Sequence, residues 1–397
     1  MVRIEIPRYT ERFGSVRIND VQRVIELDSG VDEEGQPTKL ATIHRIDGSR
    51  IRAVEKRFAV VIPIKEEKLK LLEGVLSGIP HGCSVIIVSN SPRSPIDRFK
   101  MERDLLVQYY HFAERPLVLI HQKDRVLAEA FAKAKYPEIL DEEGFVADGK
   151  AEGMIVGLLF AKLMGKDFVG FVDADNYVPG AVHEYIKIFC SGFNLAKTPY
   201  SMVRISWVYK PKISEVGLYF KKWGRISEYT NKFINLIIAS YTGFETEIVK
   251  TGSSGEHALT MKLAELMPFS SGFSLEPFEI LWLLEEFGGV KPTSHRDVMD
   301  CGVEVFQVET RNPHFHEEKG DTHLQKMLLV SLGIIYHNSL CNSSIKQSIK
   351  NELTSVGILK ADQEPPKPKI YPPISKLDLE TFRQVLEKET DTLLKLD

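Results

Sequence analysis

Two aspartates, Asp173 and Asp175, follow directly after an apolar run that is typical of a buried strand, Phe168 to Val172. Side chains alternate along an extended chain, so the two carboxylates are expected to point the same way. Paired carboxylates at a strand end offer the hard oxygen ligands that Mg²⁺ shares with phosphate oxygens. A metal held there would neutralise a departing diphosphate, which is the chemistry of glycosyl transfer from a nucleotide sugar. A turn with a capping aspartate is the simpler alternative.

A short histidine-rich segment supplies candidates for a further metal ligand. It reads Arg311-Asn-Pro-His-Phe-His316, and its alternating histidines, His314 and His316, can face one side of an extended segment. A neutral imidazole would add a nitrogen ligand to the two aspartates. The spacing excludes the His-Glu-x-x-His arrangement of zinc proteases. A polar surface loop is the alternative interpretation.

Basic and hydroxyl residues stand at two expected helix starts. Lys150, in Gly149-Lys-Ala-Glu-Gly153, opens the helix before the aspartates, where it can meet a phosphate, although the spacing of a P-loop is absent. Gly224-Arg-Ile-Ser227 opens a second helix, so Arg225 and Ser227 would form an anion pocket. The alternatives are a solvated lysine and a capping serine.

A glycine- and serine-rich loop, Thr251-Gly-Ser-Ser-Gly-Glu-His257, precedes another expected helix. Glycine permits the close approach of a backbone to a substrate, which is the functional interpretation. A flexible connector with a cap is the alternative.

Continuous apolar runs separated by helical patterns predict the scaffold for these residues. The runs are Arg57–Ile64, Cys83–Ser89, Pro116–Ile120 and Phe168–Val172, with helices expected over Glu66–Ile79 and Ala151–Met164. This pattern indicates a parallel sheet that is covered on both faces. Ligands bind outside the carboxyl ends of such strands, so Pro63, Ser89 and Asp173 are expected at one crevice.

The remaining elements are predicted from shorter patterns. Strands are expected at Met202–Trp207 and Gly302–Thr310, and helices at Arg225–Tyr241, Glu256–Met267, Pro277–Phe287, 323–353 and Leu377–Leu396. The proline-rich stretch 364–373 cannot be helical and predicts an extended linker. The expected division is a β-rich N-terminal extension (1–55), a nucleotide-sugar half (56–180), an acceptor half (181–320) and a C-terminal helical region (321–397).

Composition limits the class of protein. With 397 residues, 43% of them hydrophobic, and a net charge of -4, the chain can bury a large core but lacks the basic surplus of a nucleic-acid binder. Its four cysteines contain no Cys-x-x-Cys pair, which predicts reduced thiols in a cytoplasmic protein. The most apolar region, Met154–Val172, is interrupted by charges, and the N-terminus lacks the apolar core of a signal peptide. We therefore expect a soluble protein with no membrane contact.

In their order, these motifs closely resemble the mannosyl-3-phosphoglycerate synthases, which are retaining glycosyltransferases of the GT-A fold. The resemblance covers most of the chain, from about residue 55 to 320. It implies an α/β fold with a Rossmann-like, mostly parallel sheet flanked by helices, with β-rich N-terminal and helical C-terminal additions.

The resemblance implies roles for the residues on the nucleotide side. Val60-Val-Ile-Pro-Ile-Lys-Glu-Glu67 looks like the first strand and nucleoside loop, which implies that Pro63 and Glu66 lie near the base or ribose. Val88-Ser-Asn90 looks like the second strand end. The residues implied to bind the nucleotide sugar are Pro63, Glu66, Ser89, Asn90, Lys123, Lys150 and Ala174.

The resemblance also implies the metal and acceptor residues. Asp173-Ala-Asp175 matches the metal motif, and Arg311-Asn-x-x-x-His316 matches a further ligand, with His314 as the competing choice. Gly224–Ser227 resembles the phosphoglycerate pocket, and Gly255-Glu-His257 resembles the loop that places Glu256 near the sugar. The implied catalytic residues are Asp173, Asp175, Arg225 and Glu256, and the implied acceptor residues are Arg225, Ser227, Gly255 and His257.

The activity implied by the resemblance is metal-dependent transfer of mannose from GDP-mannose to 3-phosphoglycerate with retention, a step in the biosynthesis of the compatible solute mannosylglycerate. No carboxylate stands out as a covalent nucleophile, so displacement on the face of the leaving phosphate is the working mechanism. Mg²⁺ is the expected metal, while a histidine ligand also admits Mn²⁺, Co²⁺ or Zn²⁺. The C-terminal helices can support a homodimer or cover the catalytic domain.

Other functions compete with this one. A glucosyl-3-phosphoglycerate synthase would use UDP-glucose or GDP-glucose on the same fold, and a non-catalytic protein would only bind a nucleotide sugar. A nucleotidyltransferase usually has a glycine-rich, basic loop after the first strand, whereas this chain has Pro63-Ile-Lys-Glu-Glu67 there.

Overall fold

The computed structural model describes residues 2–22, 24–26, 43–176, 178–207, 210–214, 217–221, 225–315, 320–387 and 390–396. The chain divides into two compact units that are each discontinuous in sequence. Unit 1 comprises Met1–Ile46, Leu195–Ser254 and Phe273–Ile370, and unit 2 comprises Asp47–Asn194, Gly255–Gly272 and Tyr371–Asp397. The division into donor and acceptor halves at residue 180 stays a prediction.

The strands of unit 2 form a mostly parallel sheet. Parallel pairing follows the order β8 (Leu117–His121), β7 (Ser84–Ser89), β6 (Phe58–Ile64) and β9 (Phe168–Phe171). Most residues of these strands are buried, as expected for a sheet that is covered on both faces. Antiparallel strands flank this set: β13 (His257–Thr260) pairs with β9, and β17 (Leu394–Leu396) pairs with β8. The parallel arrangement predicted from the continuous apolar runs is confirmed.

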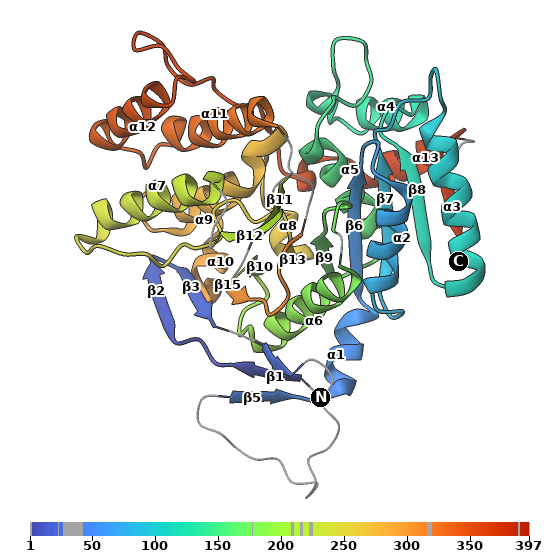
Figure 1. Ribbon diagram of the computed structural model, residues 1–397, viewed down its shortest axis with the longest axis horizontal. Coiled ribbons are helices and arrows are strands. Elements are labelled where there is room, and N and C mark those ends of the chain that lie inside the picture. Colours follow the sequence, from blue (N-terminus) through green and yellow to red (C-terminus); the bar gives the residue numbers. More distant parts are fainter. Residues whose placement is uncertain are drawn as a thin grey trace, which may run out of the picture. The chain divides into compact units, whose positions relative to one another are not determined.

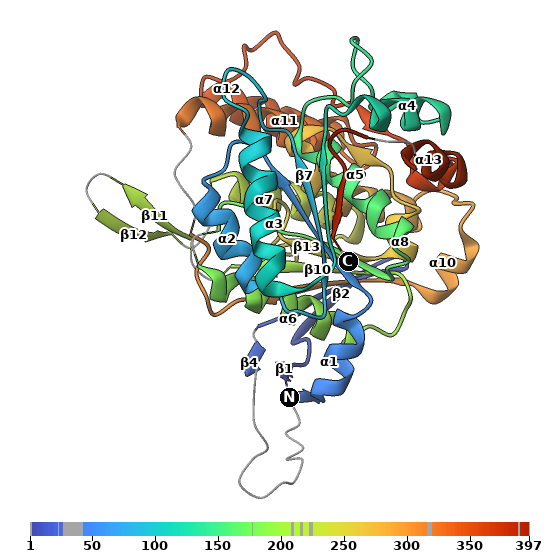
Figure 2. The ribbon, with the colours of Figure 1, turned by 90° about the vertical axis from the view of Figure 1, so that its right-hand side faces the viewer.

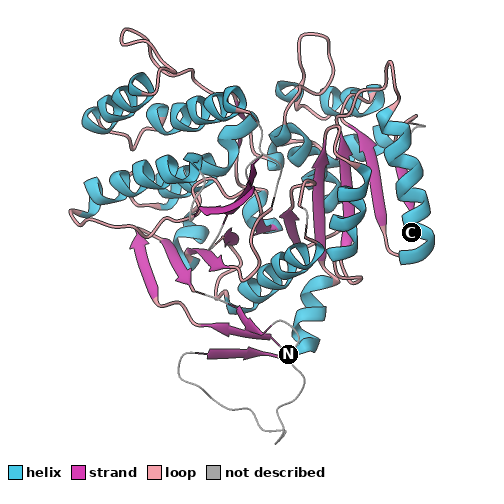
Figure 3. Ribbon diagram, viewed as in Figure 1, coloured by secondary structure: helices cyan, strands magenta, loops and turns pink. Residues whose placement is uncertain are grey.

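Helices lie on both faces of this sheet. Figure 2 shows α2 and α3 on one side of β7 and α5 on the other, and Figure 3 shows the strands of unit 2 between helices. The helices of unit 2 are α1 (Gly48–Glu55), α2 (Leu69–Gly78), α3 (Arg98–Ala113), α4 (Arg125–Lys133), α5 (Lys150–Leu163), α6 (Pro179–Leu195), α8 (Met261–Ala264) and α13 (Leu379–Leu386). Aspartates begin several of them, because the Asp97, Asp124 and Asp378 side chains accept backbone N–H bonds from the first turn.

Unit 1 also contains paired strands and helices. β10 (Ser201–Ser206), β15 (Val303–Glu309) and β3 (Val16–Val21) pair in parallel, and β2 (Tyr9–Phe13) pairs antiparallel with β3. The helices are α7 (Arg225–Thr242), α9 (Leu275–Phe287), α10 (Arg296–Cys301), α11 (Asp321–His337) and α12 (Ser343–Ser355). Figure 1 shows α11 next to α7 and α12, which agrees with their contacts.

Residues 2–46 contribute several strands to unit 1, and the predicted N-terminal extension over residues 1–55 stays a prediction. β1 (Val2–Glu5) pairs with β4 (Val24–Glu26) and β5 (Ile43–Ile46), while β2 and β3 join the main strands of unit 1. A two-stranded hairpin, β11 (Lys210–Ser214) with β12 (Gly217–Lys221), follows β10 and is seen as a separate ribbon in Figure 2. Short strands β14 (Phe269–Ser270) and β16 (Ile370–Tyr371) complete the elements, together with 3₁₀ turns at Pro137–Ile139, Gly272–Ser274 and Ile374–Lys376.

Two helix predictions are wrong. The segment Glu256–Met267 forms the strand β13 followed by the short helix α8, because the four buried residues next to β9 gain a ladder of backbone hydrogen bonds. The segment Leu377–Leu396 forms α13 and then β17, because the edge of β8 offers unpaired backbone groups to the last residues. The helices α3, α4 and α6 were not anticipated.

The last described residues are also held by a side chain. Thr392 is buried, and its hydroxyl donates to Asp124 Oδ2 over 2.5 Å and accepts from the backbone N–H of His121 over 3.3 Å. The proline-rich stretch 364–373 contains no helix, as predicted, and it is fixed where Tyr136 Oη donates to the Pro372 carbonyl. In the described part of the chain, no helix is long and apolar enough to cross a membrane.

The helix α5 approaches the sheet of unit 2 at a glycine. It is apolar on all sides and buried along almost its whole length, as a helix inside a large domain must be. A Cβ atom on Gly157 would lie 2.2 Å from Cγ1 of Val61 in β6, which is closer than any real contact. The absence of a side chain at residue 157 therefore sets the distance between α5 and β6.

We predict that Gly157→Ala lowers the free energy of unfolding by about 2 kcal/mol, because α5 must move away from β6 to admit the methyl group. Gly180→Ala is the matched control: residue 180 is also helical, and its nearest neighbour would be Val178 Cγ1 at 4.0 Å. The control should be neutral or slightly stabilising, since alanine favours helices. Urea unfolding followed by circular dichroism measures both, and equal stability of the two variants would contradict the close-packing argument.

Candidate active site

The carboxyl ends of the parallel strands of unit 2 bring most of the predicted nucleotide-side residues to one edge. Glu66 follows β6, Asn90 follows β7, Lys123 follows β8, and Asp173 follows β9. These strands are parallel neighbours, so their following loops lie at the same end of the sheet. The structure therefore confirms that these strand ends lie at one edge, which is where such sheets bind ligands.

The two aspartates lie after the end of the strand, and only the second of them is in a turn. β9 ends at Phe171, and Val172 still donates to the Val61 carbonyl over 3.1 Å, but Ala174 and Asp175 are in a turn. The alternation argument for Asp173 and Asp175 therefore does not apply, because the strand ends before both of them, and a common direction of the two carboxylates stays a prediction. Ala174 is buried, while the two carboxylates are partly exposed.

Lys150 is the partner of the first aspartate. Its Nζ lies 2.6 Å from Asp173 Oδ1, and both side chains are partly buried. Lys150 is the first residue of α5, where the helix N-terminus adds further positive potential. Gly255 lies against this pair, because a Cβ there would be 2.8 Å from Asp173 Oδ2 and 3.0 Å from Lys150 Nζ. Three predicted residues from distant parts of the sequence thus meet at one point.

Asn176 connects this turn to Glu256 and was not singled out from the sequence. Its Nδ2 donates to the Asp173 carbonyl over 2.8 Å and to Glu256 Oε1 over 3.1 Å. Both side chains are buried, and Asn176 Oδ1 has no hydrogen-bond partner among the described residues. The neighbouring His257 is wholly buried, with its ring 5.1 Å from that of Phe171. Glu256 therefore lies at the aspartate turn, whereas His257 is packed inside the sheet.

The strand-end loops of β7 and β8 are joined by polar side chains. Asn90 Nδ2 donates to Asp148 Oδ1 over 3.0 Å, and Lys123 Nζ donates to Asp141 Oδ2 over 2.7 Å and lies 3.6 Å from Asp148 Oδ1. Burial would raise the pKa of Asp141, but the hydrogen bonds from Lys123 and the Phe145 backbone outweigh it, so that pKa is lowered. This cluster presents both amide and carboxylate groups at the edge.

Glu66 has an unusual backbone. Its φ of 60° is in the left-handed region, which costs an L-residue roughly 1–2 kcal/mol. The side chain is exposed, and Pro63 lies three residues earlier in β6. Strain of this kind in an exposed loop at a sheet's carboxyl edge is typical of a functional position. Ser89, by contrast, is fully buried, so it is not available for direct contact with a ligand.

The predicted acceptor residues of unit 1 are described only in part. α7 begins at Arg225, whose side chain is not described, and Gly224 lies outside the described residues. Ser227 is buried in the first turn of this helix. The glycine loop packs against the following turn: Gly252 N donates to Asn231 Oδ1 over 2.7 Å, and Thr230 Oγ1 lies 2.9 Å from Ser253 Oγ. The loop beside the helix start is therefore held in place and is not a free connector.

A buried ion pair holds the first residue of the glycine loop, Thr251, through hydrogen bonds. Arg204 and Glu279 are both fully buried and join through Nη1 and Oε2 at 2.6 Å. The Arg204 guanidinium also donates to the Thr251 carbonyl, from Nε over 3.1 Å and from Nη2 over 2.9 Å. Gln307 Oε1 accepts from Thr251 N over 3.1 Å and from Thr251 Oγ1 over 2.8 Å. Sequence patterns did not reveal Arg204, because an arginine inside a strand is usually assigned to the surface.

The histidine candidates are only partly described. His314 is buried, and its ring lies 4.7 Å from that of Trp207. His316 lies outside the described residues. No group of three His, Cys, Asp or Glu side chains that could hold a metal ion occurs among the residues the structure describes. The choice between His314 and His316 as a metal ligand stays a prediction.

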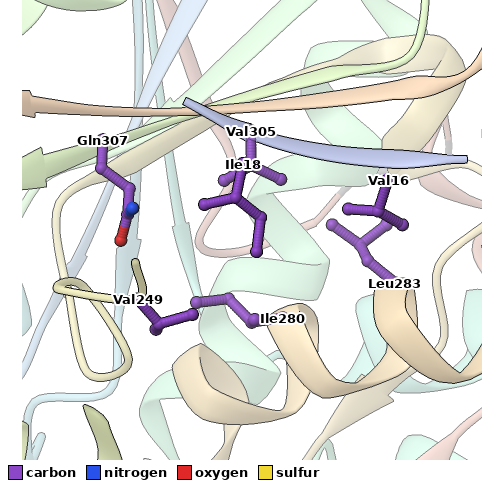
Figure 4. Close-up of a pocket in the computed structure, with 7 residues that line it drawn as sticks. All are labelled: Val16, Ile18, Val249, Ile280, Leu283, Val305 and Gln307. Atoms are coloured by element: carbon purple, nitrogen blue, oxygen red, sulfur yellow. The ribbon is translucent and has the colours of Figure 1, made fainter. Parts of the chain in front are cut away.

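One pocket in the core of unit 1 is not a candidate site. Figure 4 shows its lining, which is apolar except for Gln307. It leaves no space for a water molecule, and the Gln307 amide is already engaged, because Nε2 donates to the Ile248 carbonyl over 2.7 Å. The polar edge of unit 2 is the better candidate.

Comparison with known proteins identifies the family. A family model described as mannosyl-3-phosphoglycerate synthase matches residues 6–386. The chain belongs to the mannosyl-3-phosphoglycerate synthase family. The expected family and the expected enzyme class, a glycosyltransferase, are confirmed. Together with the mostly parallel sheet of unit 2, membership confirms the expected α/β fold class of the GT-A type.

Individual relatives of the mannosyl-3-phosphoglycerate synthase family match nearly end to end. The chain is 48% identical over 393 residues to the synthase of that name from Pyrococcus furiosus, covering 99% of each chain. It is 38% identical over 389 residues to the one from Aeropyrum pernix, covering 98% of each. Among solved structures it is similar to glucosyl-3-phosphoglycerate synthase from Mycobacterium tuberculosis in complex with Mn²⁺, uridine diphosphate and phosphoglyceric acid. That likeness has a TM-score of 0.47 and 15% identity, and covers 83% of this chain and 96% of the other.

We predict that Gly255→Ala separates Lys150 from Asp173, because the new methyl group would lie 2.8 Å from the Asp173 carboxylate and 3.0 Å from the ammonium. Misplacement by about 1 Å at a reacting centre costs roughly 100-fold in rate, so kcat should fall by about that factor. Gly180→Ala serves again as the control and should keep full activity. Turnover under saturating substrates measures the effect, and a Gly255→Ala enzyme with wild-type kcat would contradict the placement of this pair at the centre.

Proposed function

We propose that the chain transfers mannose from GDP-mannose to the free hydroxyl of 3-phosphoglycerate, with retention, and releases GDP and mannosyl-3-phosphoglycerate. The observation that supports this most is 48% identity over almost the full length to a synthase named for that product. The Lys150–Asp173 pair at the carboxyl edge of the sheet supports it independently, since it gathers charged groups where a diphosphate would bind.

The donor end suits a divalent metal and a diphosphate. Asp173 and Asp175 supply hard carboxylate oxygens, which fit Mg²⁺ and also Mn²⁺ or Co²⁺. A nitrogen from His316 or His314 would add a ligand that Zn²⁺ also accepts. When bound, the metal would neutralise charge on the diphosphate. Lys150 and the α5 N-terminus would hold the same diphosphate from the side of the helix.

The acceptor end suits a small anion. Arg225 and Ser227 stand in the first turn of α7, and an arginine at a helix N-terminus is well suited to a phosphate or carboxylate. Glu256, fixed by Asn176, would orient a hydroxyl of the sugar. Binding of the acceptor's charged groups at the start of α7 would orient its hydroxyl, which lowers the entropic cost of the reaction.

The proposed bond changes keep the sugar configuration. The acceptor oxygen forms a bond to the anomeric carbon on the face from which the diphosphate departs, and the bond from that carbon to the diphosphate oxygen breaks with its electron pair. The hydroxyl proton passes to the leaving diphosphate. Lys150 stabilises the charge that develops there.

The four cysteines are free thiols, which supports the proposed cytoplasmic location, and a homodimer stays a prediction.

The deciding test is a matrix of donors and acceptors with purified protein and Mg²⁺, following release of nucleoside diphosphate. We expect GDP release from GDP-mannose that requires 3-phosphoglycerate. Release from UDP-glucose or GDP-glucose alone would instead assign the protein to glucosyl transfer. Binding of nucleotide sugars without any release would favour a non-catalytic protein.

We further predict that Asp175→Asn lowers kcat by roughly 100-fold or more, because it removes a carboxylate ligand of the metal that would neutralise charge on the leaving diphosphate. Treatment with EDTA should abolish activity, and Mg²⁺ or Mn²⁺ should restore it. Asp167→Asn is the control, since this exposed carboxylate precedes β9 at the opposite end and pairs only at the surface with Arg57. An active Asp175→Asn enzyme, or one indifferent to EDTA, would refute the metal assignment.

A further inference from the structure

The loop after β7 is tied to a buried carboxylate on α3. Ser89 Oγ donates to Glu102 Oε2, and Ser91 Oγ donates to Glu102 Oε1, each over 2.6 Å. All three side chains are almost completely buried. Each carboxylate oxygen therefore receives a hydroxyl proton, which compensates for removal of the charge from water. Burial raises the pKa of Glu102, while the two hydroxyl bonds oppose that rise.

The strained residue of the β6 loop is held by the same serine. Glu66 N donates to Ser91 Oγ over 2.7 Å, so the Ser91 hydroxyl donates to Glu102 while it accepts from Glu66. Because the hydroxyl proton is committed to the carboxylate, its lone pairs face Glu66 N. This bond satisfies the backbone N–H of Glu66 in its left-handed conformation and so fixes the backbone that carries an exposed carboxylate.

The β8 loop is attached to the same residue. His121 Nε2 lies 2.8 Å from the Ser91 carbonyl, and Nδ1 accepts from Lys123 N over 3.1 Å. Since Nδ1 is an acceptor, the neutral ring has its proton on Nε2 and donates it to Ser91. The Ser91 N–H in turn donates to Ser89 Oγ over 3.2 Å. Every polar group of Ser91 is therefore hydrogen-bonded. The hydroxyl binds Glu102 and Glu66, the carbonyl binds His121, and the N–H binds Ser89.

We propose that Ser91 and Glu102 are positioning residues for the nucleoside end of the donor site, because they hold Glu66 and the β7 and β8 loops in one fixed arrangement. A carboxylate on a backbone that is held in this way suits a ligand that presents hydroxyl or N–H donors, such as the ribose or base of a nucleoside diphosphate. The proposal rests on the proposed function and deepens it. Neither residue touches the reacting atoms, so their loss should weaken donor binding and leave the chemical step unchanged.

The test compares Ser91→Ala and Glu102→Gln with wild type by titration calorimetry with GDP and by steady-state kinetics. We expect the GDP Kd and the donor KM to rise about tenfold, while kcat and the acceptor KM stay within about twofold. Tyr109→Phe is the matched control on the same helix, since Tyr109 Oη donates to the Leu76 carbonyl over 2.9 Å, away from the strand-end loops. It should lose stability without changing the GDP Kd.

A double-mutant cycle separates positioning from general loosening. If Ser91 acts in part through Glu66, the double variant Ser91→Ala, Glu66→Ala should weaken GDP binding by less than the sum of the two single effects. Additive effects, an unchanged Kd in Ser91→Ala and Glu102→Gln, or equal weakening in Tyr109→Phe would each overturn the proposal. This outcome can be told apart from failure of the proposed reaction. If the wild type binds GDP but makes no product, the donor and acceptor assay refutes the proposed function, while the double-mutant cycle, which measures only GDP binding, still tests the positioning role.

Discussion

Parallel pairing of β6 with β7 and β9 decides where every donor-side candidate lies. In a parallel sheet all strands end on the same side, so residues from distant parts of the sequence are collected there without any contact between their helices. The close approach of α5 to β6 at Gly157 then places Lys150, at the start of α5, beside Asp173 at the end of β9. The position of the Lys150–Asp173 pair is therefore a consequence of how closely α5 packs against β6 at Gly157.

Both units hold their loops on buried polar groups. In unit 1, the Arg204–Glu279 pair and Gln307 fix the carbonyl and the N–H of Thr251. In unit 2, Glu102 fixes two serines of the loop after β7. Burial of a charge costs free energy unless its hydrogen bonds are formed, so such a network favours the one arrangement in which all of them are present. Loops built in this way are rigid before a ligand arrives, which reduces the entropy lost on binding.

The sequence was most informative where one local rule was sufficient. Continuous apolar runs predicted the strands, and strand-end residues such as Asp173 were correctly expected at one edge. Prediction from the sequence failed where contacts between distant residues determine the local structure. The run His257–Thr260 is too short for periodicity to separate strand from helix, and only the neighbouring β9 makes it a strand. Asn176 and Glu102 resemble ordinary polar residues in the sequence, because their importance comes from partners elsewhere in the sequence that the fold brings next to them.

The pairing of residue 394 with residue 119 has a consequence for biosynthesis. β8 leaves the ribosome long before β17 and Thr392, so the edge of β8 stays open while the intervening residues are translated. An open, apolar edge strand is a template for association with other chains. Contacts between such distant residues also form slowly. The nascent polypeptide therefore has an extended period in which its sheet is incomplete, and shielding of that edge by a chaperone would favour the yield of folded protein.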